Sequence, residues 1–400
     1  MTGKGVHVGT TVRQQLEKRE GETLRDGAAL STDDRLACRE HPVEPCPFRT
    51  QFQRDYTRII HSRAFRRLRH KTQVFISPKN DHLCTRLEHS LHVASVATTV
   101  ARALDLNEDL VQAIAVGHDL GHAPFGHKGE TSLNRLAEKH RLTFAHELHS
   151  LRVVDVLESP YLSEFGYPGL NLTFAVRDGI VCHYGEGFEP SLSPDREKQP
   201  GDLKNTARGE ARPATLEGCV VRWADKVAYL GRDLEDAYTL DLVKSADLPE
   251  SVRRRLGTTN REIISALISE LVSNSPTDSD SICVGADVHE ALNDLYTFNL
   301  DRIYKTDEAM RHYGQIDRAM VFLFDFLRTR LDEADGDIKR IARGDEKTKT
   351  LVVFADFLTS DIQEWRGVQH ERLVLDFIAG MTDSFFADSF IELFLPRGTA

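Results

Sequence analysis

The stretch Ala115-Val-Gly-His-Asp-Leu-Gly-His-Ala-Pro-Phe-Gly-His-Lys-Gly129 organises the rest of the chain. An apolar helical segment leads directly into His118-Asp119. Glycines and a proline then interrupt the helical pattern, and two more imidazoles follow, His122 and His127. Burying so many polar side chains for structural reasons alone is costly. The alternative is a polar helix end whose histidines cap carbonyl groups, which suits one His-Asp pair better than three histidines.

The composition is that of an ordinary globular protein. The 400 residues are 40% hydrophobic and 28% charged, and they can bury a large core. No apolar run approaches the ~20 residues that cross a bilayer, and the N-terminus has no secretory h-region. The six cysteines form no Cys-x-x-Cys pair, which favours reduced thiols over a disulfide frame or a zinc ribbon. We therefore expect a cytoplasmic protein without a membrane partner.

One segment is strongly basic, although the formal net charge of the chain is −11. Apolar residues recur at helical spacing among seven basic side chains, Arg54, Arg58, Arg63, Arg66, Arg67, Arg69 and Lys71. We predict one amphipathic basic helix here. Two roles weigh evenly: a solvated face with arginine stems on the core, or an anion platform for phosphates or an acidic neighbouring subunit. The overall charge disfavours a general nucleic-acid binder, although a local patch keeps that partner open.

The remaining pattern is mostly helical. Residues 71–76 are the one strand-like run, and a turn is predicted at 77–81. Helices are predicted over 85–97, 129–138, 143–157, 170–184 and 215–237. Apolar periodicity is lost over 185–214, which predicts a long loop that is either a lid or disordered. Further helices fill 250–400, where 319–327 is apolar enough for a core or a subunit interface. The predicted fold class is all-α with minimal β structure.

Two sets of polar residues lie on these predicted helices. His127 and Glu130 are three residues apart, so they can face each other across the first turn of a helix. Asp225 lies in the middle of an apolar helix, where a buried carboxylate needs a partner or a metal. Asp225, Tyr229 and Asp233 follow at four-residue intervals, so one helix face presents all three. The alternative for this face is a solvent-exposed stripe.

Taken together, these motifs resemble the HD-domain metal phosphohydrolases. His89, His118-Asp119 and Asp225 match the H…HD…D signature of that group. Alone, His89 would more often be a core or capping residue, and it gains weight from the cluster that follows it. More narrowly, the chain is similar to the bacterial deoxyguanosine-triphosphate triphosphohydrolase family from residue 52 to residue 383. The similar stretches are 58–68, 71–75, 85–91, 118–127, 225–229 and 376–383.

The resemblance implies a metal site and a domain layout. The implied ligands are His89, His118, Asp119 and Asp225. This mixed nitrogen and oxygen set suits Mg²⁺ or Mn²⁺, with Fe²⁺ as a further choice. A polar lead-in would occupy 1–50, and a catalytic core of HD type would occupy 51–245 and include the 185–214 loop. A C-terminal helical region, 246–400, would pack on this core.

The resemblance also implies a reaction. Water would attack the α-phosphorus of a deoxynucleoside triphosphate, and deoxynucleoside and intact tripolyphosphate would be released. A bound ion would polarise the phosphate and lower the pKa of water. The leaving alkoxide needs a proton donor, for which His127 is the candidate, with Glu130 orienting its ring. His122 and His146 would contact phosphates or assist proton transfer.

The implied substrate contacts distinguish triphosphate from sugar. Arg86 and Lys226 would neutralise the triphosphate. Asp233 would accept a hydrogen bond from the sugar 3′-hydroxyl, with help from Gln73. Tyr229 would press against C2′ and leave no room for a 2′-hydroxyl. A homo-oligomer is expected by analogy, and an activating nucleotide, the base preference and the oligomer order stay open.

Two other functions stay open. Another HD-type nucleotide phosphohydrolase or phosphodiesterase would leave the Lys-x-x-Tyr-x-x-x-Asp pattern at 226–233 without an explanation. A non-catalytic nucleotide sensor, or a nucleic-acid-binding module, would not need four ligands and a His-Glu pair. One departure from the resembled family concerns Glu147 and His149, since an amide is expected in this segment. Its phosphate contacts are therefore open.

Overall fold

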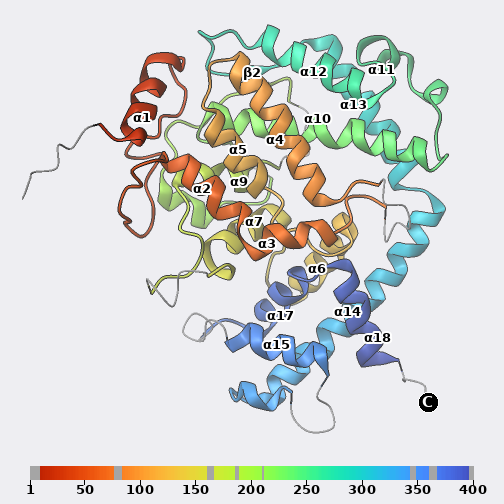
Figure 1. The fold of residues 1–400 in the computed structure, drawn as a ribbon. Coiled ribbons are helices and arrows are strands. Elements are labelled where there is room, and N and C mark those ends of the chain that lie inside the picture. The colour runs from red at the N-terminus through yellow and green to blue at the C-terminus, as the bar shows by residue number, and fades with distance from the viewer. Residues whose placement is uncertain are drawn as a thin grey trace, which may run out of the picture.

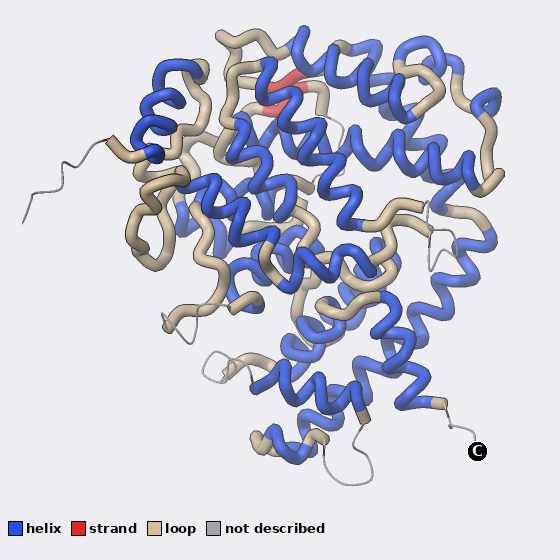
Figure 2. The backbone as a smooth tube through the Cα atoms, viewed as in Figure 1, coloured by secondary structure: helices blue, strands red, loops and turns tan. Residues whose placement is uncertain are grey.

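In the part of the chain that the structure describes, the regular secondary structure is almost entirely helical (Figures 1 and 2). The computed structural model describes residues 10–75, 83–159, 166–184, 189–209, 211–342, 348–359 and 367–395. Its one described sheet is an antiparallel pair, β1 (Ser191–Leu192) with β2 (Ile282–Cys283). The predicted all-α fold class is thereby confirmed. No described helix is both long and apolar enough to span a membrane.

The first hydrophobic core lies among helices from the N-terminal three quarters of the chain. They are α2 (Gln51–Ile60), α4 (Arg86–Ala103), α5 (Glu108–Gly117), α9 (Phe174–Cys182), α10 (Leu216–Thr239), α11 (Glu250–Arg255), α12 (Asn260–Asn274) and α13 (Ala286–Asn299). α10 packs against α4, α5 and α9, and its Trp223 is completely buried. The hydroxyl of Thr215 caps α10 at its start. The central position of α10 places its polar face within reach of α4 and α5. α1 (Val12–Thr23) lies at the edge of this core in Figure 1.

A second hydrophobic core lies in the lower part of Figure 1. It is formed by α6 (Gly126–Lys139), α14 (Asp307–Ala334), α15 (Lys349–Thr359), α17 (His370–Ala379) and α18 (Asp383–Phe394). The apolar run at 319–327 places Met320, Leu323 and Phe324 inside this core, while Phe322 is exposed. α6 directly follows the His-Asp stretch but packs on α14 and α17. α6 is therefore a helix of the second core, and it carries residues that lie near the first core.

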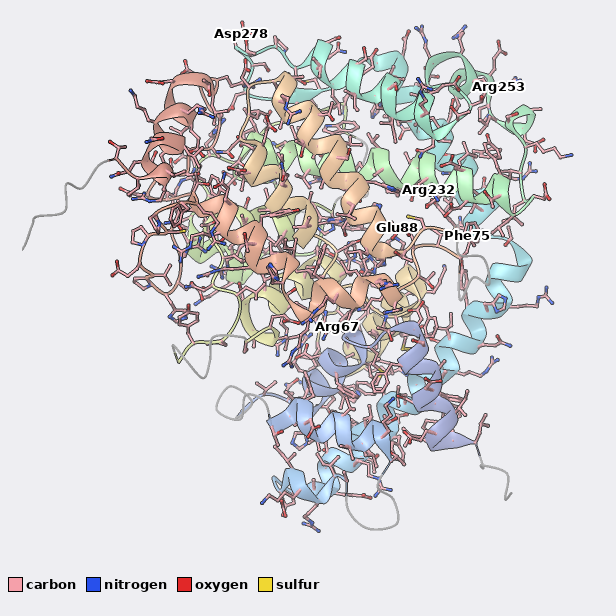
Figure 3. The ribbon with its side chains drawn as sticks, in the orientation of Figure 1. Arg67, Phe75, Glu88, Arg232, Arg253 and Asp278 are labelled. Atoms are coloured by element: carbon pink, nitrogen blue, oxygen red, sulfur yellow. The ribbon has the colours of Figure 1, made fainter. Side chains whose placement is uncertain are left out.

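The basic segment forms two helices rather than the single helix predicted. α2 ends at Ile60, and α3 (Arg63–Arg67) starts after Ser62, followed by a 3-10 turn, η1 (Leu68–His70). The side chain of Ser62 caps α3, and buried Glu158 accepts hydrogen bonds from the first amides of that helix. The prediction of one helix was wrong because these contacts start a new helix without interrupting the apolar periodicity. Figure 3 labels Arg67 where α3 faces the C-terminal helices.

The predicted strand at 71–76 is also wrong for its described residues, 71–75. Thr72 makes an isolated antiparallel bridge with Thr85, and the backbone then bends. The amide of Thr72 donates to the carboxylate of Asp383, and the ammonium of Lys71 donates to two carbonyls, so these groups are used outside any sheet. Residue 76 and the predicted turn at 77–81 lie outside the described residues.

The loop predicted at 185–214 is packed against the first core where it is described. It contains β1 and a 3-10 helix, η3 (Pro200–Asn205), whose Leu203 is buried. The ammonium of Lys198 lies 2.5 Å from Asp178 on α9. The described part of this loop is therefore ordered. Its role as a lid remains a prediction. Residues 185–188 and 210 lie outside the described residues.

Candidate metal and catalytic site

Three helices of the first core bring the four predicted metal ligands together. α4 starts at a capping box on Thr85 and presents His89 in its first turn. α5 ends just before His118 and Asp119, and the middle of α10 presents Asp225. Side chains of His89, His118 and Asp225 each offer a ligand atom within 4.8 Å of the others. The packing of these three helices therefore brings together residues that are far apart in sequence.

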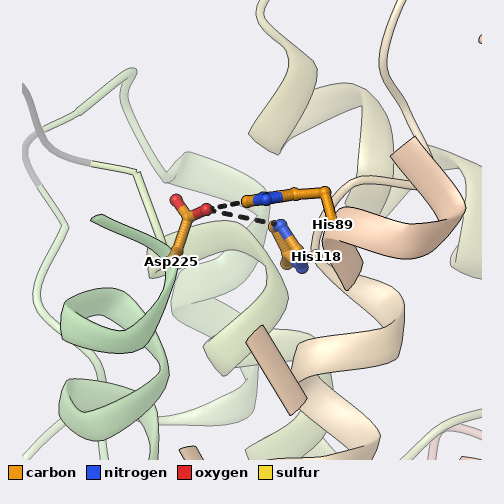
Figure 4. A group of neighbouring side chains, drawn as sticks. All are labelled: His89, His118 and Asp225. Carbon is orange, nitrogen blue, oxygen red and sulfur yellow. Dashed lines mark hydrogen bonds and ion pairs between the residues drawn. The ribbon is translucent and has the colours of Figure 1, made fainter. Parts of the chain in front are cut away.

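The nitrogen atoms of this cluster face carboxylate oxygens (Figure 4). His89 Nε2 lies 2.9 Å, and His118 Nε2 3.7 Å, from Asp225 Oδ1. His118 Nδ1 is 2.7 Å from the carbonyl of Ala115, which fixes the proton on that nitrogen. His118 Nε2 is buried and has no hydrogen-bond partner among the described residues. A lone pair held in this way beside two carboxylates fits a divalent cation.

The electrostatics keep the carboxylates ionised. Burial would raise the pKa of Asp119, but the charges of His118 and Arg86 hold it well below its usual range. Burial would also raise the pKa of Asp225, but the hydrogen bond from His89 and the charges of the nearby imidazoles lower it. Burial lowers the pKa of His89, yet Asp225 outweighs it, so the pKa is raised. Because a metal binds the neutral ring, ion binding must displace the proton that Asp225 holds on His89.

The cluster opens into a cavity of about 350 Å³, a size typical of small-molecule sites. Every predicted site residue except His118 lines it, and His118 is completely buried next to it. The lining residues from the predicted set are Gln73, Arg86, His89, Asp119, His122, His127, Glu130, His146, Asp225, Lys226, Tyr229 and Asp233. The fold thus brings the predicted metal, proton-transfer and substrate residues to one cavity.

The predicted proton-transfer residues form a chain on one side of this cavity. His127 lies in the first turn of α6, with its side chain 66% exposed and Nδ1 3.6 Å from Glu130 Oε2. Buried Glu130 lies closer to His146, at 3.0 Å from its Nδ1. Burial would raise the pKa of Glu130, but the charge of His146 and hydrogen bonds hold it well below its usual range. Burial lowers the pKa of His146, whereas Glu130 and Glu147 raise it to about 9. Glu130 and His146 are therefore an ion pair at neutral pH, with His127 beside it.

Two further histidines adjoin this pair. The rings of His122 and His146 stack at 4.2 Å between centroids. Burial and the charges of Arg86 and His146 hold the pKa of His122 well below its usual range, so its ring is neutral. His183, at the end of α9, was missed in the sequence; its Nε2 lies 3.1 Å from His146 Nε2. Burial lowers the pKa of His183 to about 3. Its position at a helix end, like that of His118, was the available signal.

The cavity lining also includes tyrosines and the predicted sugar contacts. Tyr304, also missed, donates a 2.5 Å hydrogen bond to Asp233. Burial raises the pKa of Asp233 to about 7, against the opposing effect of this bond. Burial lowers the pKa of Lys226 to about 8, so its ammonium remains charged at neutral pH. Arg86 is buried and lies 2.7 Å from Asp119, so its nearest anion is a predicted metal ligand.

Comparison with known sequences shows which protein family this chain belongs to. The HD domain family matches residues 86–230, and the family described as phosphohydrolase-associated domain matches residues 282–391. The chain is 38% identical over 385 residues to a deoxyguanosinetriphosphate triphosphohydrolase-like protein of Caldanaerobacter subterraneus subsp. tengcongensis, with 96% of each chain covered. A protein of the same name from Desulfatibacillum aliphaticivorans is 36% identical over 96% of this chain and 99% of its own. The chain belongs to the deoxyguanosinetriphosphate triphosphohydrolase-like family. The predicted resemblance is thereby confirmed.

The two matches do not follow the two cores, because the HD match includes α6 of the second core and the associated-domain match includes α13 of the first. The HD domain match covers α4 to the middle of α10, and so includes all four predicted ligands. The associated domain covers α13, α14, α15, α17 and most of α18. α11, α12 and α13 pack in the first core, although the predicted boundary at 246 assigns them to the C-terminal region. That boundary remains a prediction.

The basic segment of this chain lines a second cavity, of about 1670 Å³. Its arginines are Arg49, Arg54, Arg58, Arg63, Arg66 and Arg67. Some have internal partners: Arg58 donates to the carbonyls of Leu170 and Asn171, and Arg67 lies 3.5 Å from Glu158. The solvated face and the anion platform both remain open, because the same arginines serve the fold and line the cavity.

Proposed function

We propose that this protein hydrolyses deoxynucleoside triphosphates, dGTP or a broader set, to deoxynucleoside and tripolyphosphate. One observation carries the proposal: a buried His/Asp cluster and the chain from His127 through Glu130 to His146 open into the same cavity of about 350 Å³. Membership of the family and the match to the HD domain support a nucleotide phosphohydrolase. Attack at the α-phosphorus and the choice of deoxynucleotides are our inference.

The donor set supports a divalent metal ion as cofactor. His89, His118, Asp119 and Asp225 would hold it, and Mg²⁺ or Mn²⁺ suits their oxygens and nitrogens, with Fe²⁺ as a further choice. When bound, the ion would supply Lewis-acid polarisation of the phosphate and a more acidic water molecule. The carbonyl of Ala115 and the guanidinium of Arg86 would hold His118 and Asp119 in place.

The proton-transfer residues would act at the leaving group. His127 would donate a proton to the 5′-oxygen of the deoxynucleoside, which is a poor leaving group as an alkoxide. Glu130 would orient His127, and the ion pair with His146 would keep Glu130 anionic. A neutral His122, held against His146, would donate to a phosphate oxygen or accept from a water molecule bound there.

The remaining lining residues would select the substrate. Arg86 and Lys226 would neutralise phosphate charge, and Gln73 would support the sugar. Asp233 would accept the hydrogen bond of the 3′-hydroxyl, held in place by Tyr304. Tyr229 would lie against C2′ and exclude ribonucleotides. Because Asp225 and Tyr229 are one turn of α10 apart, they would fix the position of the sugar relative to the phosphate.

Product analysis tests this function. Purified protein is incubated with each dNTP in Mn²⁺ or Mg²⁺, and products are separated by anion-exchange chromatography, with His118→Ala as the control. We expect deoxynucleoside and tripolyphosphate, and neither from the control. Release of deoxynucleoside monophosphate or diphosphate would instead indicate another HD-type hydrolase. Nucleotide binding with no turnover under either metal would indicate a sensor.

A further inference from the structure

The turn that precedes His127 is held from the far end of the chain. Asp383, the first residue of α18, is buried. Its Oδ1 accepts the amide of Phe125 at 2.9 Å, and its Oδ2 accepts the amide of Thr72 at 3.0 Å. These partners are 258 and 311 residues away in sequence. One carboxylate therefore joins two segments of the catalytic cavity to the second core.

This turn has an unfavourable backbone that needs support. Phe125 has φ of +63° and Gly126 has φ of +57°, both in the left-handed region. A residue with a side chain adopts this region only at a cost, and persists there when its surroundings hold it. Phe125 precedes α6 without a side-chain cap, so Asp383 supplies the anion that this helix start lacks.

A second contact fixes the other end of the same turn. The buried ammonium of Lys71 donates to the carbonyl of His122 and, at 2.7 Å, to the carbonyl of Ala379 at the end of α17. The carbonyl of His122 and the amide of Phe125 are thus both tied to the C-terminal helices. His127 follows two residues later, and among the described residues its exposed ring has one ion-pair contact, with Glu130. The direction of the His127 ring therefore depends on how this turn positions the first turn of α6.

We propose that Asp383 is a positioning residue that sets where His127 stands relative to the metal end of the cavity. It touches neither the ligand cluster nor the cavity, and it acts through the amide of Phe125. The same carboxylate holds Thr72 and so places the adjacent Gln73. The proposal rests on the proposed function, in which His127 donates the proton.

The test compares Asp383→Asn with Asp388→Asn, a matched change at an exposed position of the same helix. An asparagine keeps one acceptor oxygen, but its amide group faces the second N–H with another donor. We expect Asp383→Asn to keep its metal content and a KM within about twofold, while kcat falls by about 10- to 100-fold, the cost of a ~1 Å misplacement. Hydrogen exchange should become faster in peptides covering 122–126, and Asp388→Asn should match the wild type in every measurement.

A double-variant cycle separates positioning from general weakening. In a His127→Ala background, Asp383→Asn should cause no further fall in kcat, because the displaced group is already absent. A further fall of the same size, an unchanged kcat in the single variant, or equal losses of metal and KM would overturn the proposal. If Asp383→Asn does not fold, Asp383→Ser, which keeps a small acceptor, takes its place under the same criteria.

The exchange measurement keeps the two proposals distinguishable. If wild-type protein turns over no dNTP, the proposed function fails whatever Asp383 does. Faster exchange at 122–126 in Asp383→Asn would then still support the tie to the turn, whereas unchanged exchange there would overturn it.

Discussion

The two ends of the catalytic cavity are built in different ways. At the metal end, His89, His118 and Asp225 project from or directly follow long helices of the first core, and their side chains contact each other. At the other end, His127 is 66% exposed and follows a left-handed turn tied to Asp383. The first arrangement depends on helix packing within the HD region. The second depends on contacts between segments more than half the chain apart, so substitutions at the two ends should fail differently.

The largest effect is expected at the metal end. His118→Ala should abolish both metal binding and turnover, because it removes a buried nitrogen that faces two carboxylates. Asp119→Ala should do the same and should also lower Tm, since it leaves the buried guanidinium of Arg86 without its anion. Metal analysis, thermal unfolding and a dNTP assay measure these effects. A full metal complement with normal activity in either variant would contradict the ligand assignment.

The next largest effect is a loss of turnover on substitution of His127, at the exposed end of the cavity. His127→Ala should keep its metal and bind substrate, yet lose turnover by about 10² or more, the scale of general acid–base catalysis. Glu130→Gln should show a weaker form of this defect, and a lower Tm as well because Glu130 pairs with buried His146. Activity and metal content are measured on the same preparations. Loss of metal from His127→Ala would make His127 a ligand and place the proton donor elsewhere.

A smaller effect is expected on the preference for deoxyribonucleotides over ribonucleotides. Tyr229→Ala should admit ribonucleotides, with the preference for dGTP over GTP falling from at most ~10², which is what an apolar wall achieves against an added hydroxyl. Tyr229→Phe is the matched control, since it keeps the ring and should keep the preference. The ratio of kcat/KM values for the two substrates is the measurement. Equal turnover of GTP and dGTP by the wild type would show that α10 does not select the sugar.

The smallest effect is a pH dependence. Burial raises the pKa of Asp233 to about 7, and the ionised carboxylate accepts a stronger hydrogen bond from the 3′-hydroxyl than the neutral acid does, so KM should rise as pH falls through this value. Tyr304→Phe removes a hydrogen bond that lowers this pKa, so the rise should move to higher pH. Asp233→Asn should remove this dependence. A wild-type KM that stays constant about one unit either side of this pKa would exclude Asp233 as the acceptor.

At the metal end, local sequence patterns single out some of the candidate residues, whereas the set of four ligands is what the resemblance to the HD-domain family implies. His118-Asp119 ends an apolar helical pattern, and Asp225 interrupts another, so residue type and position indicate the chemistry. The fold class followed in the same way from periodicity, although Ser62 and Glu158 divide the basic helix without changing its apolar pattern.

The other contacts depend on which segments pack together. Thr72 lies in a strand-like run, and its amide is taken by Asp383 from the second core. Tyr304 reaches Asp233 across 71 residues, and no pattern in either segment indicates this pair. His183 gave only the weak signal of a histidine at a helix end. The roles of the site residues therefore remain predictions at both ends. The resemblance marked 376–383, but nothing in the sequence indicated which segments this stretch contacts.

The fate of the oxygen atom of water tests the proposed reaction most directly. dGTP is hydrolysed with Mn²⁺ in H₂¹⁸O, and the products are analysed by mass spectrometry, with His118→Ala as the control. Attack at the α-phosphorus breaks its bond to the 5′-oxygen, so we expect unlabelled deoxyguanosine and tripolyphosphate carrying one labelled oxygen. Labelled deoxyguanosine, or formation of dGDP and labelled phosphate, would contradict a triphosphohydrolase that acts at the α-phosphorus.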